Sequence, residues 1–110
     1  MSIFLLTCAD EKEADRISKV LLKKRLVACV KKFPVNSSFW WKGKIDKSDE
    51  IVLLLESIEA NFKKVEKEVQ KLHSYETFVL FSLPVGQTTN DVENWLKKEL
   101  LLPSNSRKTS

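Results

Sequence analysis

The sequence has few of the residues that interrupt regular structure, with 2 glycines and 3 prolines among its 110 residues. This scarcity leaves little room for long irregular loops. Glycine-rich phosphate loops and dinucleotide-binding fingerprints need several closely spaced glycines. Because Gly43 and Gly86 lie in different halves of the chain, both kinds of nucleotide site are excluded.

Cysteine and net charge are also sparse. The 2 cysteines, Cys8 and Cys29, lie inside apolar segments and are too few for a disulfide framework. The formal net charge is only +4, which is too weak to indicate a nucleic-acid or membrane partner. Residues 1–8 lack the basic start of a signal peptide, and no apolar run reaches the roughly 18 residues of a membrane span. We therefore expect a cytoplasmic protein without nucleic-acid or membrane partners.

The apolar periodicity predicts the element order β-α-β-β-α-β followed by a C-terminal helix. A capping box at Asp10 and Glu13 is expected to begin the first helix, and a second one at Asn90 and Glu93 the last helix. Strands are expected at 3–8, 26–33, 51–55 and 77–85, with a break or bulge at 34–38. A long central hairpin over 35–55 is expected to turn at Lys42-Gly43. This pattern is typical of the α+β, ferredoxin-like split βαβ fold. We expect one domain over 1–102 and a disordered polar tail at 103–110.

The hairpin carries two adjacent tryptophans, Trp40 and Trp41. Neighbouring side chains of a strand point to opposite faces, so at least one of these rings must leave the core of its own subunit. Aromatic rings are enriched where proteins meet. The hairpin is therefore predicted to contact a partner.

The candidate chemistry lies where the second helix meets the last strand, at His73, Tyr75 and Glu76. Imidazole is the commonest metal ligand, but a histidine that ends a helix also commonly caps its last carbonyl groups, and both interpretations remain open. Cys29, Cys8 and Glu76 are further donors. Such a set suits copper or zinc better than magnesium or calcium. By pattern alone, a cysteine such as Cys29 is more often a small core residue than a ligand.

Four segments resemble, in order, motifs of the CutA family of divalent-cation tolerance proteins. Leu22–Val30 resembles that family's helix-to-strand segment, and Trp40–Ile45 resembles its Tyr/Trp-Trp-x-Gly hairpin. Lys71–Glu76 resembles its Leu-His-Pro-Tyr-Glu motif, and Asn94–Leu96 its closing Trp-Leu helix. Two departures are present, because Ser74 replaces the usual proline and 77–79 replaces a Val/Thr-Pro-x-Ile continuation.

The resemblance implies a cytoplasmic homotrimer, in which the long hairpin wraps a neighbour, linked to copper and other divalent metals. It implies Cys29 and His73 as metal ligands, and Glu76 remains the third candidate on its own chemistry. No catalytic or organic-cofactor residues are expected, the protein is not expected to be an enzyme, and no metal is expected to be required for folding. The alternative is a trimeric signalling module resembling the nitrogen-regulatory PII proteins, in which His73, Lys42 and Lys44 would contact a small anion between subunits.

Overall fold

The computed structural model describes residues 1–100. Its elements are β1 (Ser2–Cys8), α1 (Glu11–Lys23), β2 (Cys29–Trp41), β3 (Lys44–Ser57), a 3-10 turn (Glu59–Asn61), α2 (Phe62–Leu72), β4 (Leu80–Pro84) and α3 (Asn90–Glu99). The sheet order is β2-β3-β1-β4, and each neighbouring pair is antiparallel. The predicted α+β ferredoxin-like fold, with its long hairpin and C-terminal helix, is confirmed. The tail predicted at 103–110 lies outside the described residues.

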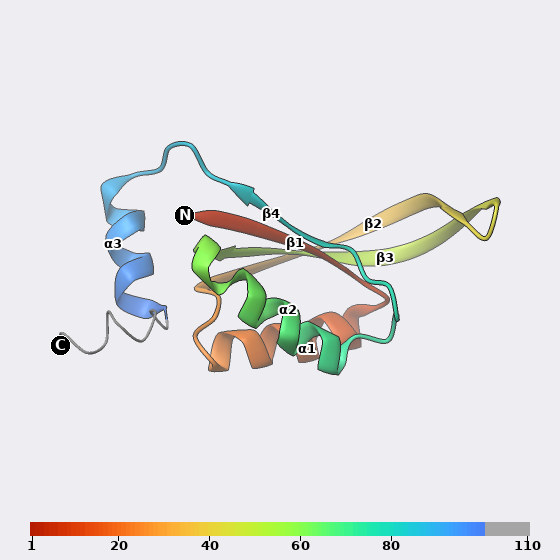
Figure 1. Ribbon diagram of the computed structural model, residues 1–110, viewed down its shortest axis with the longest axis horizontal. Coiled ribbons are helices and arrows are strands. Elements are labelled where there is room, and N and C mark those ends of the chain that lie inside the picture. The colour runs from red at the N-terminus through yellow and green to blue at the C-terminus, as the bar shows by residue number, and fades with distance from the viewer. Residues whose placement is uncertain (101–110) are drawn as a thin grey trace.

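Helices α1 and α2 pack side by side on one face of the sheet, and α3 lies beyond its end (Figure 1). Along β1 the side chains alternate between buried and partly buried, so that Phe4, Leu6 and Cys8 face the helices with no exposed surface. Ile17 of α1 and Val65 of α2 complete the same core. None of the helices within residues 1–100 is both long and apolar enough to cross a membrane.

The opposite face of the sheet, here called the open face, is also apolar. Leu5 and Ile3 point away from the helices and pair in register with Phe81 and Leu83 of β4. Phe81 is 42% exposed and Leu83 is 49% exposed. Phe33 of β2, in register with Val52, extends this apolar surface across the sheet. Such a surface is typical of a protein that binds a partner there.

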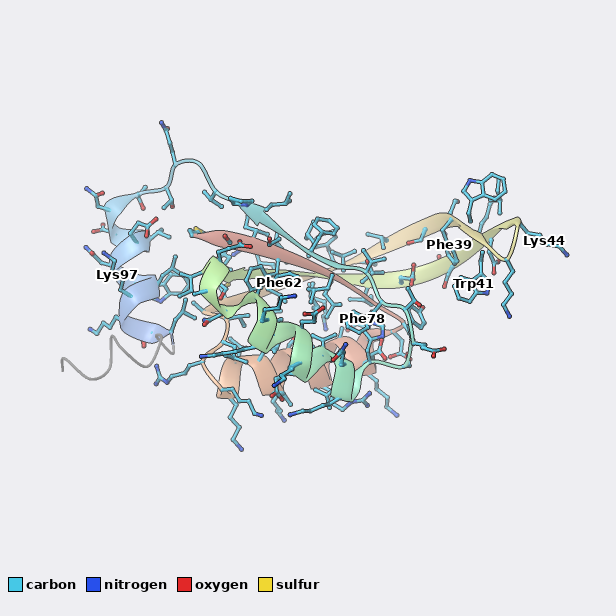
Figure 2. The ribbon with its side chains drawn as sticks, in the orientation of Figure 1. Phe39, Trp41, Lys44, Phe62, Phe78 and Lys97 are labelled. Carbon is cyan, nitrogen blue, oxygen red and sulfur yellow. The ribbon has the colours of Figure 1, made fainter. Side chains whose placement is uncertain are left out.

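The β2–β3 hairpin projects well beyond the rest of the sheet (Figure 1). Its turn is the predicted Lys42-Gly43 pair, with φ angles of 50° and 78°. These positive values match the tight turn whose twist suits a two-residue hairpin. Figure 2 shows Phe39, Trp41 and Lys44 on the part of the hairpin farthest from the helices. Trp40 is 73% exposed and Trp41 is 53% exposed, so both rings lie outside the core of the subunit.

The break or bulge predicted at 34–38 was wrong, because β2 runs without interruption through Pro34 and keeps a one-to-one register with β3. Because β2 is an edge strand, its outer side has no neighbouring strand. Pro34, which lacks an N–H group, therefore loses no hydrogen bond of the sheet on that side. The expected start of β2 at Leu26 was also wrong. Leu26 and Val27 are buried core residues of the turn that follows Arg25, whose φ of 57° reverses the chain.

Two further boundaries differ from the expectation. The last strand spans only Leu80–Pro84, because the preceding residues form the irregular connection that carries His73. Helix α3 is capped by Thr89, whose hydroxyl accepts the N–H of Val92, so Asn90 is the first helical residue and not the cap. The predicted cap at Asp10 is confirmed, because its carboxylate accepts the N–H of Glu13 at 2.9 Å.

Candidate metal site

The chain's only histidine is the residue that ends α2. Its N–H donates to the carbonyl of Val69, and its φ and ψ of −77° and 138° end the helix in an extended conformation. The ring turns inward and has no exposed surface. Its Nδ1 atom accepts the backbone N–H of Tyr75 at 3.0 Å, and its Nε2 atom lies 2.8 Å from the carbonyl oxygen of Thr7. These partners fix the neutral tautomer in which Nε2 carries the hydrogen and donates to Thr7.

The ring of His73 therefore does not cap α2. The carbonyl of Leu72 instead accepts a guanidinium N–H of Arg16 at 3.2 Å. The histidine joins the end of β1 to residues 73–79, here called the 73–79 connection. The N–H of Thr7 reaches the same connection by donating to the carbonyl of Val79 at 3.2 Å.

Glu13 anchors this connection from the first turn of α1. Its Oε2 atom accepts the N–H of Ala9 at 2.7 Å, and its Oε1 atom accepts the N–H of Ser74 at 2.6 Å. The residue is only 3% exposed. Burial by itself would raise the pKa of Glu13. Hydrogen bonds from the backbone of Ala9 and from the side chain and backbone of Ser74, together with the nearby His73 ring, outweigh it, so the pKa is lowered and the carboxylate is anionic. The sequence pattern identified Glu13 only as part of a capping box.

Cys8, the last residue of β1, faces Glu13 and His73 from the sheet. Burial, together with the carboxylates of Glu13, Asp10 and Glu50, raises the pKa of its thiol to about 12. One donor atom from each of Cys8, Glu13 and His73 lies within 4.8 Å of the other two. The Nε2 atom of His73 is 3.6 Å from Oε2 of Glu13. The fold thus collects a thiol, a carboxylate and an imidazole at one buried point.

Tyr75 closes the outer side of this point. Its hydroxyl donates to Oε2 of Glu50 at 2.9 Å, and burial followed by the hydrogen bond to Glu50 raises the pKa of the phenol to about 12. The His73 ring lies between two aromatic rings, with centroids 5.0 Å from Tyr75 and 5.2 Å from Phe78. Figure 2 shows Phe78 close to the C-terminal end of α2. Glu50 was not identified from the sequence. It directly precedes a buried apolar run, and an acidic residue in that position usually lies in solvent at the end of the strand.

A cleft of about 600 Å³ opens at the base of the hairpin, next to the Tyr75–Glu50 bond. Its polar lining is mainly acidic and is supplied by Asp10, Glu11, Asp49 and Glu50. A concave surface with charges of one sign raises the local concentration of ions of the opposite sign. The cleft is therefore suited to cations.

The other two predicted ligands lie elsewhere in the subunit. Cys29 begins β2 on the open face, in register with Glu56. Its sulfur accepts a hydrogen bond from Nζ of Lys31 at 3.4 Å. Cys8 pairs with Ile51, so the segment 51–56, roughly 17 Å at the usual strand rise, separates the two cysteines along β3. Glu76 is exposed on the 73–79 connection and does not belong to the donor group at His73 in residues 1–100. One subunit does not bring Cys29 to His73.

Together these features define a small ferredoxin-like α+β protein with an extended hairpin and a buried set of donors suited to a borderline or soft metal ion. The model of the CutA1 divalent ion tolerance protein family matches residues 2–99. The chain belongs to this family.

Named relatives agree with this assignment. The divalent-cation tolerance protein CutA of Thermotoga maritima is 37% identical over 95 residues, which cover 86% of this chain and 94% of the relative. The CutA of Archaeoglobus fulgidus is 36% identical over 91 residues, covering 83% and 89%. Its solved structure, described as a periplasmic divalent cation tolerance protein, has a TM-score of 0.87 and covers 90% of this chain and 98% of its own. A Pyrococcus horikoshii CutA1 structure, the D60A mutant, has a TM-score of 0.89 at 29% identity, covering 93% and 100%.

Proposed function

We propose that the protein is a homotrimer that binds a divalent metal ion, copper or alternatively zinc, and contributes to divalent-cation tolerance without enzymatic turnover. The observation that carries the metal-binding part is the placement of the chain's only imidazole. The His73 ring is buried, its Nδ1 atom accepts the N–H of Tyr75, and its Nε2 atom lies 3.6 Å from the anionic carboxylate of Glu13. Neutral imidazole is the form that binds metal ions, and a neighbouring anion favours a bound cation. We place the protein in the cytoplasm, as the sequence predicts.

Two apolar surfaces support the homotrimer. The open face presents Phe33, Phe81 and Leu83, and the hairpin presents Trp40 and Trp41, all of them 40% exposed or more. Water contact with so many large apolar side chains costs free energy, which burial against other copies of the chain would recover. The family resemblance supplies the stoichiometry of three.

The predicted ligand set of His73, Cys29 and Glu76 requires that assembly. Cys29 lies on the open face, whereas His73 ends α2 and lies beside Cys8 and Glu13 on the helix side of the sheet. A site that combines them therefore needs a neighbouring subunit to bring its Cys29 close to the 73–79 connection. The exposed Glu76 is free to turn toward such a contact.

The experiment combines light scattering with calorimetric titration of zinc and copper into the purified protein. We expect the mass of a trimer at micromolar concentration and saturable binding of at least one of the two metals. A monomeric mass would contradict the trimer, and the absence of heat with both metals would contradict metal binding. A separate titration with a nucleotide tests the PII-like alternative, which predicts that this anionic ligand binds. Cys29→Ser and Glu76→Gln replace side chains outside the core, and weaker binding in either variant would identify that residue as a ligand.

A further inference from the structure

The buried carboxylate of Glu13 has no lysine or arginine beside it within residues 1–100. Within residues 1–100 its oxygen atoms receive the N–H groups of Ala9 and Ser74 and face the His73 ring, and no lysine or arginine contacts them. A buried charge is costly unless it is paired, and backbone dipoles compensate it only in part. The thiol of Cys8 lies beside this anion with no exposed surface. A metal cation bound at this location would balance the carboxylate.

We propose that Cys8, Glu13 and His73 bind one zinc or copper ion, and that binding releases the backbone N–H of Tyr75 from the His73 ring. This inference rests on the proposed metal-binding function and names the ligands of that site. It assigns the sulfur donor to Cys8, in place of Cys29, and the carboxylate donor to Glu13, in place of Glu76.

The distances suit a small tetrahedral site. Zinc bonds of about 2.0–2.3 Å to nitrogen, oxygen and sulfur place neighbouring donors about 3.3–3.7 Å apart. The separation of 3.6 Å between His73 Nε2 and Glu13 Oε2 already has this value. The three donors all lie within 4.8 Å of one another, so a shift of about 1 Å completes the set. Water or a further side chain would supply the fourth ligand.

The hydrogen bonds of His73 couple metal binding to the 73–79 connection. To bind a metal through Nε2, the ring must lose the hydrogen that it now donates to Thr7. In the neutral ring that hydrogen then sits on Nδ1, which faces the N–H of Tyr75 at 3.0 Å. Two donors cannot form a hydrogen bond, so the Tyr75 amide must move away. On binding, the thiol proton of Cys8 passes to water, and the metal–sulfur bond replaces the S–H bond.

The test of the ligands uses cobalt, which takes zinc sites and gives an absorption band when a thiolate binds it. Cobalt(II) is titrated without oxygen into the wild type, Cys8→Ser and the matched control Cys29→Ser. We expect the sulfur-to-cobalt band in the wild type and in Cys29→Ser, and its loss in Cys8→Ser. We also expect zinc affinity at least tenfold weaker in Glu13→Gln. A band that persists in Cys8→Ser, or cobalt bound without any such band, would overturn the assignment while leaving the proposed metal-binding function intact.

The second measurement needs no substitution and therefore does not depend on whether the variants fold. Zinc is added to nitrogen-15-labelled wild-type protein, and the His73 ring nitrogens and the Tyr75 amide are followed by NMR. We expect all three resonances to shift together up to one zinc per subunit. Bound zinc that leaves the Tyr75 amide and the His73 ring unchanged would refute the inference. A wild-type protein that binds neither zinc nor copper would refute both this inference and the proposed function.

Discussion

The backbone N–H of Ser74 donates to Oε1 of Glu13 at 2.6 Å and thereby joins the 73–79 connection to the first turn of α1. The resembling CutA motif has proline at this position, and proline has no N–H to donate. The preceding residue, His73, has φ and ψ of −77° and 138°, which are values that a residue before proline readily adopts. The backbone of His73 is therefore compatible with either residue, and the hydrogen bond to Glu13 is what the serine adds.

Ser74→Pro is expected to lower the free energy of unfolding. A hydrogen bond to a charged group contributes about 1.5–3 kcal/mol, whereas proline recovers only about 0.4–1 kcal/mol by restricting the unfolded chain. The net loss is about 1 kcal/mol, measurable by urea denaturation. Ser74→Ala is the control, because it keeps the N–H and should lose less than Ser74→Pro. Equal or higher stability of the proline variant would show that the bond to Glu13 contributes little.

The bond between Tyr75 and Glu50 gives a second prediction. Tyr75→Phe removes the hydroxyl and leaves a carboxylate that is 7% exposed without its donor, so we expect a loss of about 1–2 kcal/mol. Glu50→Gln should cost less in the Tyr75→Phe background than in the wild type. The double-mutant cycle, measured by chemical denaturation, should give a coupling of at least about 0.5 kcal/mol. Additive effects would mean that the two groups act independently.

The fold followed from the sequence because its signals are local. The short apolar strand β1, the cap at Asp10 and the turn at Lys42-Gly43 each depend on a few adjacent residues, and all three lie where they were expected. The uninterrupted path of β2 through Pro34 could not be predicted in the same way. It depends on β2 being an edge strand, which is a property of the whole sheet.

The candidate site was predicted only in part, because its contacts are distant in sequence. The position of His73 at the end of α2 followed from periodicity. Its neighbours, Cys8 and Glu13, are set by the pairing of β1 with β3 and by the packing of α1 against α2, which no spacing encodes. Glu13 in particular combines two roles, since one residue begins a helix and also holds a distant connection.

Glu59 provides a prediction for the dependence of stability on pH. Its carboxylate accepts hydrogen bonds from the hydroxyls of Ser2 at 2.7 Å and Ser82 at 2.8 Å. These bonds, of which the one from Ser2 has the larger effect, hold the pKa of Glu59 below its ordinary value of 4.5. Because the folded pKa is the lower one, the ionised group stabilises the fold above about pH 4.5. This contribution is lost as the pH falls through the folded pKa.

The expected result is that wild type exceeds Glu59→Gln in stability at pH 7 and that the difference shrinks below about pH 4.5. The measurement is the urea concentration at the midpoint of unfolding, determined from about pH 3 to about pH 7 in steps of about half a pH unit. Ser82→Ala, which removes one of the two hydroxyls, should show the same trend with a smaller difference. A gap between wild type and Glu59→Gln that is constant over this range would contradict the assignment.

The hairpin turn gives the last prediction, in which two substitutions have opposite effects. Lys42 has a φ of 50°, a left-handed value that costs a residue with a Cβ atom roughly 1–2 kcal/mol. Asparagine tolerates this region and forms the preferred pair with a following glycine, so Lys42→Asn should stabilise the turn. It also removes the Lys42 ammonium that lies 5.9 Å from the Trp41 ring, an exposed contact that contributes only about 0.5–1 kcal/mol. We expect the conformational gain to be the larger effect.

Gly43→Ala should destabilise the same turn. Its φ is 78°, and an added Cβ would meet no atom within 4 Å, so the whole cost is conformational. Because the hairpin projects from the body, it can open without global unfolding, and hydrogen exchange of the Trp41 and Lys44 amides is the appropriate measurement. Exchange should slow in Lys42→Asn and accelerate in Gly43→Ala, while the amides of β1 remain unchanged in both. Faster exchange in Lys42→Asn would show that the contact between Lys42 and Trp41 outweighs the left-handed strain.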